Sequence, residues 1–414
     1  MNEVKDSSAP TADRPRLWVV SELYYPEETS TGYYLTRIAE GLTSKFEVKA
    51  ISGQPNYSAR GIRAPKHEFR NGVEIFRVAG TTLDKNVIVF RLINMLTLGF
   101  PTFLTALLRV RAGDRVLVVT NPPVMPFLMA AAALFRGSAY TLLVHDNYPE
   151  ILIAAGKSKE SSLFVSGMAY MNRWLYKHAA RIIVVGRDMF ELMTRKTDGL
   201  DVPIAVIPNW AELETVSPTP RSENELLEEL DLQDKFVILY AGNMGPPNDI
   251  ESVVDAAEMI RNDTVFHFIF LGAGAKKNWL MNAVRERSLS NISVLDPKPR
   301  GEQIVFLNAC DISLVSLVGK MWGVSMPSRT YNILAAGKPI LGITEDGSET
   351  DRVIREERVG WNVPPHDPAA LVAALRKARA RAAELSEMGE RARKAAETKY
   401  SLEAALQRYQ AEIN

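Results

Sequence analysis

Two successive series of short apolar segments constrain the fold of this chain more than any other feature. The first series consists of residues 17–20, 48–51, 73–78, 115–119, 140–144, 181–185 and 205–207. The second follows a polar, acidic segment and consists of residues 236–240, 266–271, 292–295, 312–315, 340–343 and 360–363. Helix-like stretches separate most of these segments, which is typical of open, largely parallel sheets covered by helices on both faces. We therefore predict an α/β protein with two halves joined by a linker.

Composition narrows the class of protein. The chain has 414 residues, enough for two domains, and is 46% hydrophobic and 24% charged, as globular proteins are. Lys+Arg and Asp+Glu both number 49, which argues against a dedicated nucleic-acid binder. The single cysteine, Cys310, excludes an internal disulfide and a multi-cysteine metal site, so we expect a reducing compartment. With no HExxH pair and no Asp-x-Asp, a protein-bound catalytic metal is not expected.

The segment SMPSRTYNILAAGKPILGI, residues 325–343, carries the strongest signal for a binding site. Pro327 and Ser328 are expected to begin a helix and Gly337 to end it, with a buried strand to follow. The first-turn amides of such a helix have no partner within it and attract anions, and Arg329 adds a positive charge. The segment is either an ordinary helix of an α/β domain or a cradle for a diphosphate.

Other candidate loops lie where predicted strands end, which is where open α/β sheets bind ligands. They are residues 22–32, 120–123, 145–147, 242–245 and 272–274. The Gly272-Ala273-Gly274 triplet lacks the third glycine of a dinucleotide-binding loop, and no acidic residue ends a following strand about twenty positions on. A redox Rossmann enzyme is therefore disfavoured.

Two long apolar runs, residues 87–108 and 124–135, belong to the first half. Arginine, asparagine and proline interrupt the longer run, which disfavours a transmembrane helix. Two interpretations remain. Both runs are buried helices of the domain, or they form a monotopic surface that dips into a membrane with Arg91, Arg109 and Arg111 at its rim.

Ten short segments follow one another in a recognisable order. They are ELYYPEETSTGYYLTRIAEGL, VVTNPPV, LLVHDNYPE, VVGRDM, VIPNWAEL, LYAGNMG, FLGAGAKKNWL, ACDISLVSL, MPSRTYNILAAGKPIL and GWNVPPHDPAAL. Together, over roughly residues 16–412, they resemble the family 4 glycosyltransferases of the GT-B fold. The similarity is greatest to the branch that builds bacterial surface polysaccharides and moves fucose-type or N-acetylated sugars.

The resemblance implies two Rossmann-like, doubly wound parallel-sheet domains that face a cleft. It also implies an acceptor on the first domain, a nucleotide-sugar donor in the second, and retention of the anomeric configuration. The expected division is a disordered tail (1–15), an acceptor-binding domain (16–208), a linker (209–234), a nucleotide-sugar-binding domain (235–396) and a helix packing back on the first domain (397–414).

Some family positions carry over residue by residue. His145 matches the family histidine that lines the cleft near the transferred sugar; the alternative is a histidine of the core. Gly32 matches a small residue that lets a backbone amide approach the donor phosphate; the alternative is a simple helix start. Gly242 and Asn243 occupy the family's Gly-Arg pair, and Asn248 replaces the lysine that usually follows.

Both usual cations are therefore missing. Arg300, Lys320 and Arg329 are the candidates to replace them, the alternative for each being an ordinary surface charge. We expect the nucleotide diphosphate to be held by helix-start amides at Met326–Arg329 and by the glycine backbone at Gly242–Gly245. The other candidate contacts of the nucleotide are Gly272, Pro327, Ser328 and Thr330.

The family's Glu-x7-Glu pair is also changed, because its positions hold Val324 and Asn332. Asn332 can still accept a hydrogen bond from a ribose hydroxyl, whereas the valine side chain cannot. Glu349, on the loop after the next strand, is a substitute ligand for ribose or sugar hydroxyls, or else a solvated acid.

The sequence thus predicts a retaining glycosyltransferase with a UDP-sugar favoured as donor and a GDP-sugar next. The expected acceptor is a saccharide linked to a polyprenyl diphosphate, with the enzyme cytoplasmic and peripheral at the inner face of the cell membrane, bound to its anionic surface. No metal, cofactor or nucleic acid is expected. Two alternatives remain: a catalytically degenerate protein that binds sugar nucleotide or a partner transferase, and a sugar-nucleotide epimerase.

Overall fold

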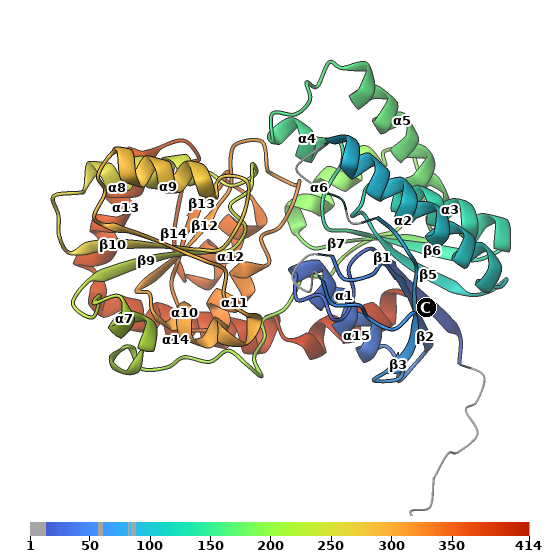
Figure 1. The fold of residues 1–414 in the computed structure, drawn as a ribbon, viewed down its shortest axis with the longest axis horizontal. Coiled ribbons are helices and arrows are strands. Elements are labelled where there is room, and N and C mark those ends of the chain that lie inside the picture. The colour runs from blue at the N-terminus through green and yellow to red at the C-terminus, as the bar shows by residue number, and fades with distance from the viewer. Residues whose placement is uncertain (1–13, 57–60, 82, 84–87, 414) are drawn as a thin grey trace, which may run out of the picture. The chain divides into compact units, whose positions relative to one another are not determined.

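The structure is a computed structural model that describes residues 14–56, 61–81, 83 and 88–413 (Figure 1). The side chains of residues 88, 91 and 92 are also outside the description. Packing divides the chain into two compact units. The first takes the described residues of Met1–Leu143, Leu175–Ile183 and Arg408–Asn414, and the second takes Val144–Trp174 and Val184–Gln407. Most of the predicted tail, residues 1–13, lies outside the described residues, and the predicted boundary at residue 208 stays a prediction.

The structure has strands and helices in alternation. The strands are β1 Arg16–Ser21, β2 Glu47–Ser52, β3 His67–Arg70, β4 Val73–Arg77, β5 Arg115–Val119, β6 Ala139–Val144, β7 Arg181–Val184, β8 Ile204–Val206, β9 Phe236–Ala241, β10 Phe266–Leu271, β11 Ile292–Leu295, β12 Ile312–Ser316, β13 Ile340–Ile343 and β14 Gly360–Val363. The helices are α1 Ser30–Gly41, α2 Ile88–Arg109, α3 Met125–Arg136, α4 Glu150–Ala154, α5 Leu163–His178, α6 Arg187–Lys196, α7 Glu225–Glu229, α8 Ile250–Met259, α9 Lys277–Glu286, α10 Gln303–Asn308, α11 Arg329–Ala335, α12 Glu349–Glu357, α13 Pro368–Ala380, α14 Ala382–Lys399 and α15 Leu402–Glu412.

The first sheet has the strand order β3-β4-β2-β1-β5-β6-β7-β8. Its defined pairs are parallel except for β3, which runs antiparallel to β4. The sequence did not predict β3, because its four residues, HEFR, alternate between exposed and half-buried positions and contain no apolar run. Helices α2 and α3 cover one face of this sheet and α1 the other (Figure 1).

The second sheet is parallel throughout and has the order β11-β10-β9-β12-β13-β14. Helices α8, α9 and α13 lie on one face and α10, α11 and α14 on the other (Figure 1). After β9 the chain builds outward through β10 and β11, and then returns to place β12 on the other side of β9. In open α/β sheets, ligands bind beyond the carboxyl ends of the strands at such a switch point.

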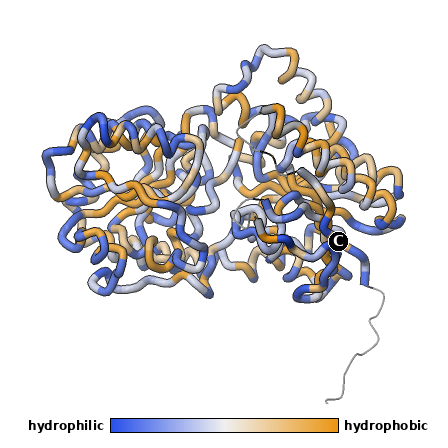
Figure 2. Tube along the Cα trace, in the orientation of Figure 1, coloured by the Kyte–Doolittle hydropathy of each residue, from blue (hydrophilic) through white to orange (hydrophobic). Residues whose placement is uncertain are grey.

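The hydrophobic residues are concentrated on the strands of both sheets (Figure 2). All six residues of β10, FHFIFL, are buried, as expected of a strand covered by helices on both faces. The predicted fold class, two doubly wound parallel α/β sheets, is confirmed. The alanine- and arginine-rich segment of residues 369–396 forms two helices, since α13 ends at Ala380 and α14 begins at Ala382.

Candidate active site

The switch point of the second sheet brings together the loop after β9 and the segment leading into α11. Gly242, directly after β9, has φ +145°, a conformation that side chains disfavour. A Cβ at this position would lie 2.8 Å from Cζ of Arg329. Glycine is needed here because the guanidinium of Arg329 rests against the backbone of the loop.

Arg329 has an unpaired donor. Its guanidinium carbon lies 4.6 Å from the centroid of the Tyr240 ring, and its Nη2 donates to Oδ1 of Asn248 at 3.4 Å. Its Nη1 is buried and has no hydrogen-bond partner. A buried charged donor without a partner is costly, and an anion that accepts from it would remove this cost.

The loop that carries this cation is held by its own side chains. Asn248 Nδ2 donates to the carbonyl oxygen of Asn243 at 2.9 Å, and the Tyr240 hydroxyl donates to the same oxygen at 2.7 Å. Burial raises the pKa of Tyr240, so the phenol stays neutral and donates. The asparagine that replaces the family lysine thus positions Arg329 and the loop.

Gly272, predicted to contact nucleotide, has a packing role in the structure. A Cβ on Gly272 would lie 2.0 Å from the carbonyl oxygen of Gly242, so these two strand ends can approach only without side chains. Contact between Gly272 and a nucleotide stays a prediction.

The loop of His145 is anchored to the segment that leads into α11. Asn147 donates from its backbone nitrogen to the Val324 carbonyl at 2.8 Å and from Nδ2 to the Gly323 carbonyl at 2.7 Å. Asp146 forms an isolated β-bridge with Ser325. The structure therefore brings the loop of His145 together with residues 323–325, directly before the predicted nucleotide-binding residues 326–329.

Burial also sets the charge of His145. Desolvation lowers the pKa of its imidazole to about 4, so the ring is neutral at physiological pH. A neutral imidazole can orient a hydroxyl group by hydrogen bonding, but it contributes no positive charge toward a phosphate.

The first turn of α11 differs from the sequence prediction. The helix has only seven residues, and Ser328 occupies its N-cap position without a side-chain capping bond. The amides of Thr330 and Tyr331 donate back to the carbonyls of Pro327 and Ser328, at 3.1 and 3.2 Å. These two amides are therefore paired within the chain, whereas the predicted anion donors, the helix-start amides at Met326–Arg329, stay a prediction. The roles of Met326, Pro327 and Ser328 stay predictions.

A buried polar cluster engages two other predicted site residues. The Asn332 side-chain oxygen accepts a hydrogen bond from the Glu212 backbone nitrogen at 3.0 Å. Its Nδ2 donates two hydrogen bonds, to Glu212 Oε1 at 2.5 Å and to Gln303 Oε1 at 2.7 Å. Arg300 donates to both carboxylate oxygens of Glu212, from Nε at 2.8 Å and Nη2 at 2.5 Å. Both ends of the Asn332 amide are thus engaged within the chain, and Arg300 already neutralises a buried acid. Their predicted contacts with donor remain untested.

Glu349 is likewise engaged. Its Oε2 accepts from the backbone nitrogen of Arg187 at 2.8 Å and from Nε at 2.9 Å. Burial raises the pKa of this carboxyl, while the hydrogen bonds from Arg187 oppose the shift. The neighbouring Asp188 accepts from the Gly323 nitrogen at 3.1 Å, so α6 supports the same segment as Asn147. A ribose contact by Glu349 stays a prediction.

Two predicted residues remain, Lys320 in the second unit and Gly32 in the first. Lys320 has φ +67° and an exposed side chain, with Nζ 3.5 Å from Glu160 Oε1. Gly32 lies in the first unit, in α1, whose N-cap is Thr29. A Cβ on Gly32 would lie 2.7 Å from the carbonyl oxygen of Glu27, so glycine permits the tight start of the helix.

Sequence reasoning missed Tyr240, Asn147, Arg187 and Glu212. All four stand inside quoted family segments, and Asn147 also lies in the candidate loop 145–147, so position in the segment was the available signal. Nothing in the sequence indicated the partners of Glu212, which lie 88–120 residues away in the chain. Within the described residues, no group of three His, Cys, Asp or Glu side chains could hold a metal ion, and metal independence stays a prediction.

The fold and site define an α/β protein of the GT-B type. The structure superposes on Anabaena HepE in complex with UDP with a TM-score of 0.72 and 11% identity, covering 96% of this chain and 98% of that one. Two family models match the sequence: a glycosyl transferase 4-like domain at residues 30–210 and glycosyl transferases group 1 at residues 222–395.

Two proteins of similar sequence identify the family of the chain. A Pseudomonas aeruginosa protein named as a glycosyltransferase, WbjE, is 32% identical over 363 residues, which cover 86% of this chain and 87% of WbjE. An Escherichia coli (strain K12) protein named as a colanic acid biosynthesis glycosyl transferase, WcaI, is 24% identical over 368 residues, covering 86% and 90%. The chain belongs to the family 4 glycosyltransferases of the GT-B fold. The predicted fucosyl branch stays a prediction.

Proposed function

We propose that this glycosyltransferase transfers a sugar, with retention of configuration, from a nucleoside-diphosphate donor to a saccharide acceptor. The unpaired, buried Nη1 of Arg329 beside the Gly242 backbone carries the proposal. The position suits the diphosphate of a donor, because a charge-assisted hydrogen bond from a guanidinium is strongest toward such an oxyanion.

The chemistry needs charge stabilisation at the leaving group. As the bond between the anomeric carbon and the diphosphate oxygen breaks, negative charge grows on the diphosphate, and Arg329 is positioned to stabilise it. The acceptor hydroxyl forms the new bond on the same face of the sugar and gives its proton to a departing phosphate oxygen. His145 is neutral and would orient the sugar rather than act as a base.

The donor proposed first is a UDP-sugar, with a GDP-sugar next, and no metal takes part. HepE was crystallised with UDP, which supports this order. A role in surface polysaccharide biosynthesis is supported by WcaI, whose name assigns it to colanic acid biosynthesis.

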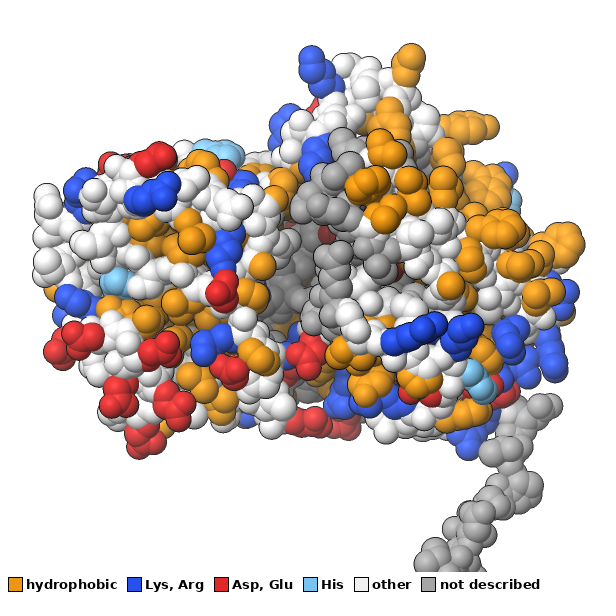
Figure 3. Space-filling model, viewed as in Figure 1, with side chains coloured by type: hydrophobic (Ala, Val, Ile, Leu, Met, Phe, Trp, Pro, Cys, Tyr) orange, Lys and Arg blue, Asp and Glu red, His pale blue; other side chains and the backbone are white. Residues whose placement is uncertain are grey.

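The acceptor proposed is linked to a polyprenyl diphosphate, with the first unit held at an anionic membrane surface. Helix α2 presents a stripe of exposed apolar side chains at helical spacing, which we call the apolar stripe. It consists of Val89, Ile93, Leu96, Phe100, Leu104 and Leu108. Figure 3 shows hydrophobic side chains gathered over α2 and α3, where Leu134 and Phe135 add to the exposed surface. Contiguous exposed patches of this kind mark interaction sites.

The two helices form one surface. A Cβ on Gly99 of α2 would lie 2.8 Å from Leu128 Cδ1 of α3, so the glycine allows close packing of the pair. Within the described residues, no helix is both long and apolar enough to span a bilayer. The stripe suits a helix that lies in the membrane interface instead.

The predicted basic rim is only partly described. Arg111 is exposed, whereas the guanidinium carbon of Arg109 lies 4.0 Å from the centroid of the Phe76 ring. The side chain of Arg91 lies outside the described residues. To contact a lipid headgroup, the Arg109 guanidinium must therefore either give up its contact with the Phe76 ring or contact the ring and the headgroup together.

Product analysis tests the function directly. Protein incubated with mixed UDP- and GDP-sugars and polyprenyl-diphosphate saccharides should yield an extended saccharide with the donor's configuration. Nucleotide binding without product would support the degenerate alternative, which Val324 motivates because it is 2% exposed and packs in an apolar cluster. An isomerised donor would identify an epimerase.

A further inference from the structure

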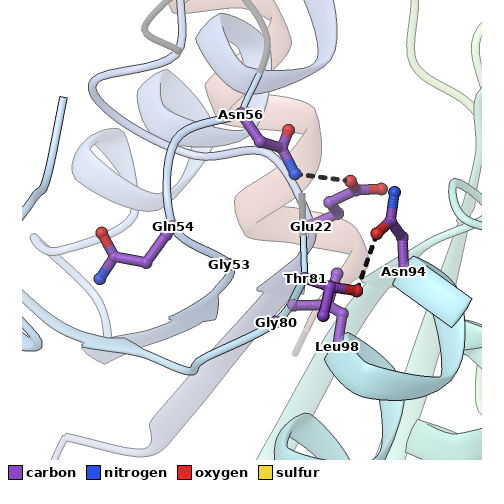
Figure 4. Close-up of a pocket in the computed structure, with 8 residues that line it drawn as sticks. All are labelled: Glu22, Gly53, Gln54, Asn56, Gly80, Thr81, Asn94 and Leu98. Carbon is purple, nitrogen blue, oxygen red and sulfur yellow. Dashed lines mark hydrogen bonds between the residues drawn. The ribbon is translucent and has the colours of Figure 1, made fainter. Parts of the chain in front are cut away.

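The pocket beside α2 in the first unit is small (Figure 4). Its polar side chains bind one another: Asn56 Nδ2 donates to Glu22 Oε1 at 3.1 Å, and the Thr81 hydroxyl donates to Asn94 Oδ1 at 2.8 Å. Its free space fits about one water molecule, so the pocket suits a bound water rather than a substrate. In the second unit, in contrast, side chains from two separate elements meet at one glycine of the segment between β12 and α11.

This glycine, Gly323, is held by both of its backbone groups. Its nitrogen donates to Asp188 Oδ2 at 3.1 Å, and its carbonyl oxygen accepts from Asn147 Nδ2 at 2.7 Å. Gly323 has φ +71°, and a Cβ on it would lie 2.9 Å from the Asp188 carbonyl oxygen and 2.9 Å from Leu192 Cβ. Only glycine therefore lets the segment lie this close to α6. We call Asn147, Asp188 and Gly323 the Gly323 clamp.

The two side chains of the clamp are well suited to fix a backbone. Asn147 and Asp188 are both buried, and the bond from Gly323 to the carboxylate is charge-assisted. Asp188 Oδ1 accepts from the Met189 nitrogen at 2.8 Å, so the carboxylate is itself fixed to the first turn of α6. Removal of either side chain would leave a buried backbone group of Gly323 without its partner, which is costly.

The clamp lies between two predicted site residues. Asn147 stands two residues after His145, and Gly323 stands six residues before Arg329. The two segments also pair through their backbones. In the proposed reaction His145 orients the sugar and Arg329 stabilises the diphosphate, so the clamp joins the two sides of the bond that breaks. A misplacement of about 1 Å between reacting groups can lower a rate about 100-fold.

We propose that Asn147 and Asp188 are positioning residues of this glycosyltransferase. By holding Gly323 between them, they set the position of His145 relative to Arg329. Their effect on sugar transfer rests on the proposed function, whereas their hold on the backbone of Gly323 does not.

Amide hydrogen exchange on the full chain tests this hold without any substrate. In wild type the Gly323 amide should exchange slowly, because it donates to a buried carboxylate. Asp188→Asn keeps the shape of the side chain but leaves one acceptor oxygen for the amides of Gly323 and Met189. Asn147→Ala removes the donor to the Gly323 carbonyl. Each variant should raise the exchange rate of residues 322–325 about tenfold.

Turnover tests the positioning. With the UDP- or GDP-sugar and acceptor that wild type turns over, Asn147→Ala and Asp188→Asn should each lower kcat about tenfold to 100-fold. The affinity for UDP in calorimetry should stay within about threefold of wild type, because Arg329 is held separately, against Gly242. The double variant should lose little more kcat than the weaker of the two single variants, because both substitutions act on the same glycine.

Asn291→Ala is the matched control. Asn291 resembles Asn147 in being buried, in donating from Nδ2 to a backbone carbonyl, that of Ala257 at 2.9 Å, and in having no partner for Oδ1. It stands before β11 and belongs to no predicted site. This variant should lose as much thermal stability as Asn147→Ala does, yet keep the kcat of wild type.

Three results would overturn the proposal. They are unchanged exchange at residues 322–325 in Asn147→Ala, a loss of kcat in Asn291→Ala equal to that in Asn147→Ala, and losses of log kcat that add in the double variant. If Asp188→Asn does not fold, the comparison of Asn147→Ala with Asn291→Ala decides alone. Absence of any sugar transfer by wild type would count against the proposed function, and the exchange rates would still show whether the clamp holds Gly323.

Discussion

The guanidinium of Arg329 rests against the backbone of Gly242, where a Cβ would come within 2.8 Å of its central carbon. The contact couples the loop after β9 to α11, and it fixes the position of Nη1, a buried Arg329 nitrogen that has no hydrogen-bond partner. Two features of the sequence that were interpreted separately, a glycine after a strand and a cation at a helix start, are one unit in the structure.

Gly242→Ala should therefore weaken binding of UDP. The new Cβ would displace the guanidinium, and φ +145° is unfavourable for alanine. We expect a loss of about tenfold or more in affinity for UDP in calorimetry, with uridine affected much less. Gly301→Ala is the control, because a Cβ there meets nothing within 4 Å. Unchanged UDP affinity in Gly242→Ala would contradict the coupling.

His145→Ala should lower turnover and leave the fold intact. The imidazole is neutral and its loop is held by Asn147 and Asp146 through bonds that do not involve the ring. Initial rates and a thermal melt measure the two effects separately. A variant that unfolds near room temperature, yet keeps wild-type activity below its melting temperature, would identify His145 as a core histidine only.

Acid should destabilise the protein through two histidines. Burial lowers the pKa of His145 and of His267 to about 4, whereas an unfolded histidine titrates near pH 6.5. The unfolded state binds more protons between these values, so the free energy of unfolding should fall as the pH drops from about 6.5 to about 4. Each histidine should contribute about 1–2 kcal/mol of this loss by pH 5.

Urea unfolding at pH 7 and pH 5 measures this dependence, with His145→Gln and His267→Gln as the comparison. Glutamine does not titrate, so each variant should lose less stability on acidification than wild type does. An equal loss in wild type and both variants would show that other groups cause it.

Membrane binding should depend on the apolar stripe. Leu96 and Phe100 are 64% and 68% exposed, and burying such a side chain in the interface is worth about 1.5–3 kcal/mol. Leu96→Gln/Phe100→Gln should therefore abolish co-sedimentation with anionic vesicles at low salt. Phe69→Gln is the control, since Phe69 is 71% exposed and lies on β3.

The contribution of the basic rim is tested by charge-reversal variants and by the salt dependence of vesicle binding. Arg109→Glu/Arg111→Glu should reduce vesicle binding at low salt, and high salt should reduce wild-type binding, because each cation contributes about 1 kcal/mol near an anionic surface. If wild-type protein stays in the supernatant at low salt, the membrane surface and the lipid-linked acceptor lose their support.

The sequence predicted the strands well because most are continuous apolar runs. For β5, β10, β11, β13 and β14 the predicted and observed bounds coincide. Partners of side chains were less predictable, because they depend on residues far apart in the chain. The pairing of Arg300 with Glu212, 88 residues away, could not be predicted from the sequence. The same holds for the hydrogen bonds that Glu349 accepts from Arg187, 162 residues away, and the predicted donor contacts of both residues stay predictions.

Arg329→Ala tests the central claim most directly. Calorimetry would compare UDP and uridine on wild type and variant, with Arg329→Lys as the variant that keeps the charge. Removing a charge-assisted hydrogen bond should cost about 1.5–3 kcal/mol for UDP. Uridine should bind wild type and Arg329→Ala with nearly the same affinity. The affinity of Arg329→Lys for UDP should lie between those of wild type and Arg329→Ala. Equal losses for UDP and uridine would show that Arg329 does not face the diphosphate.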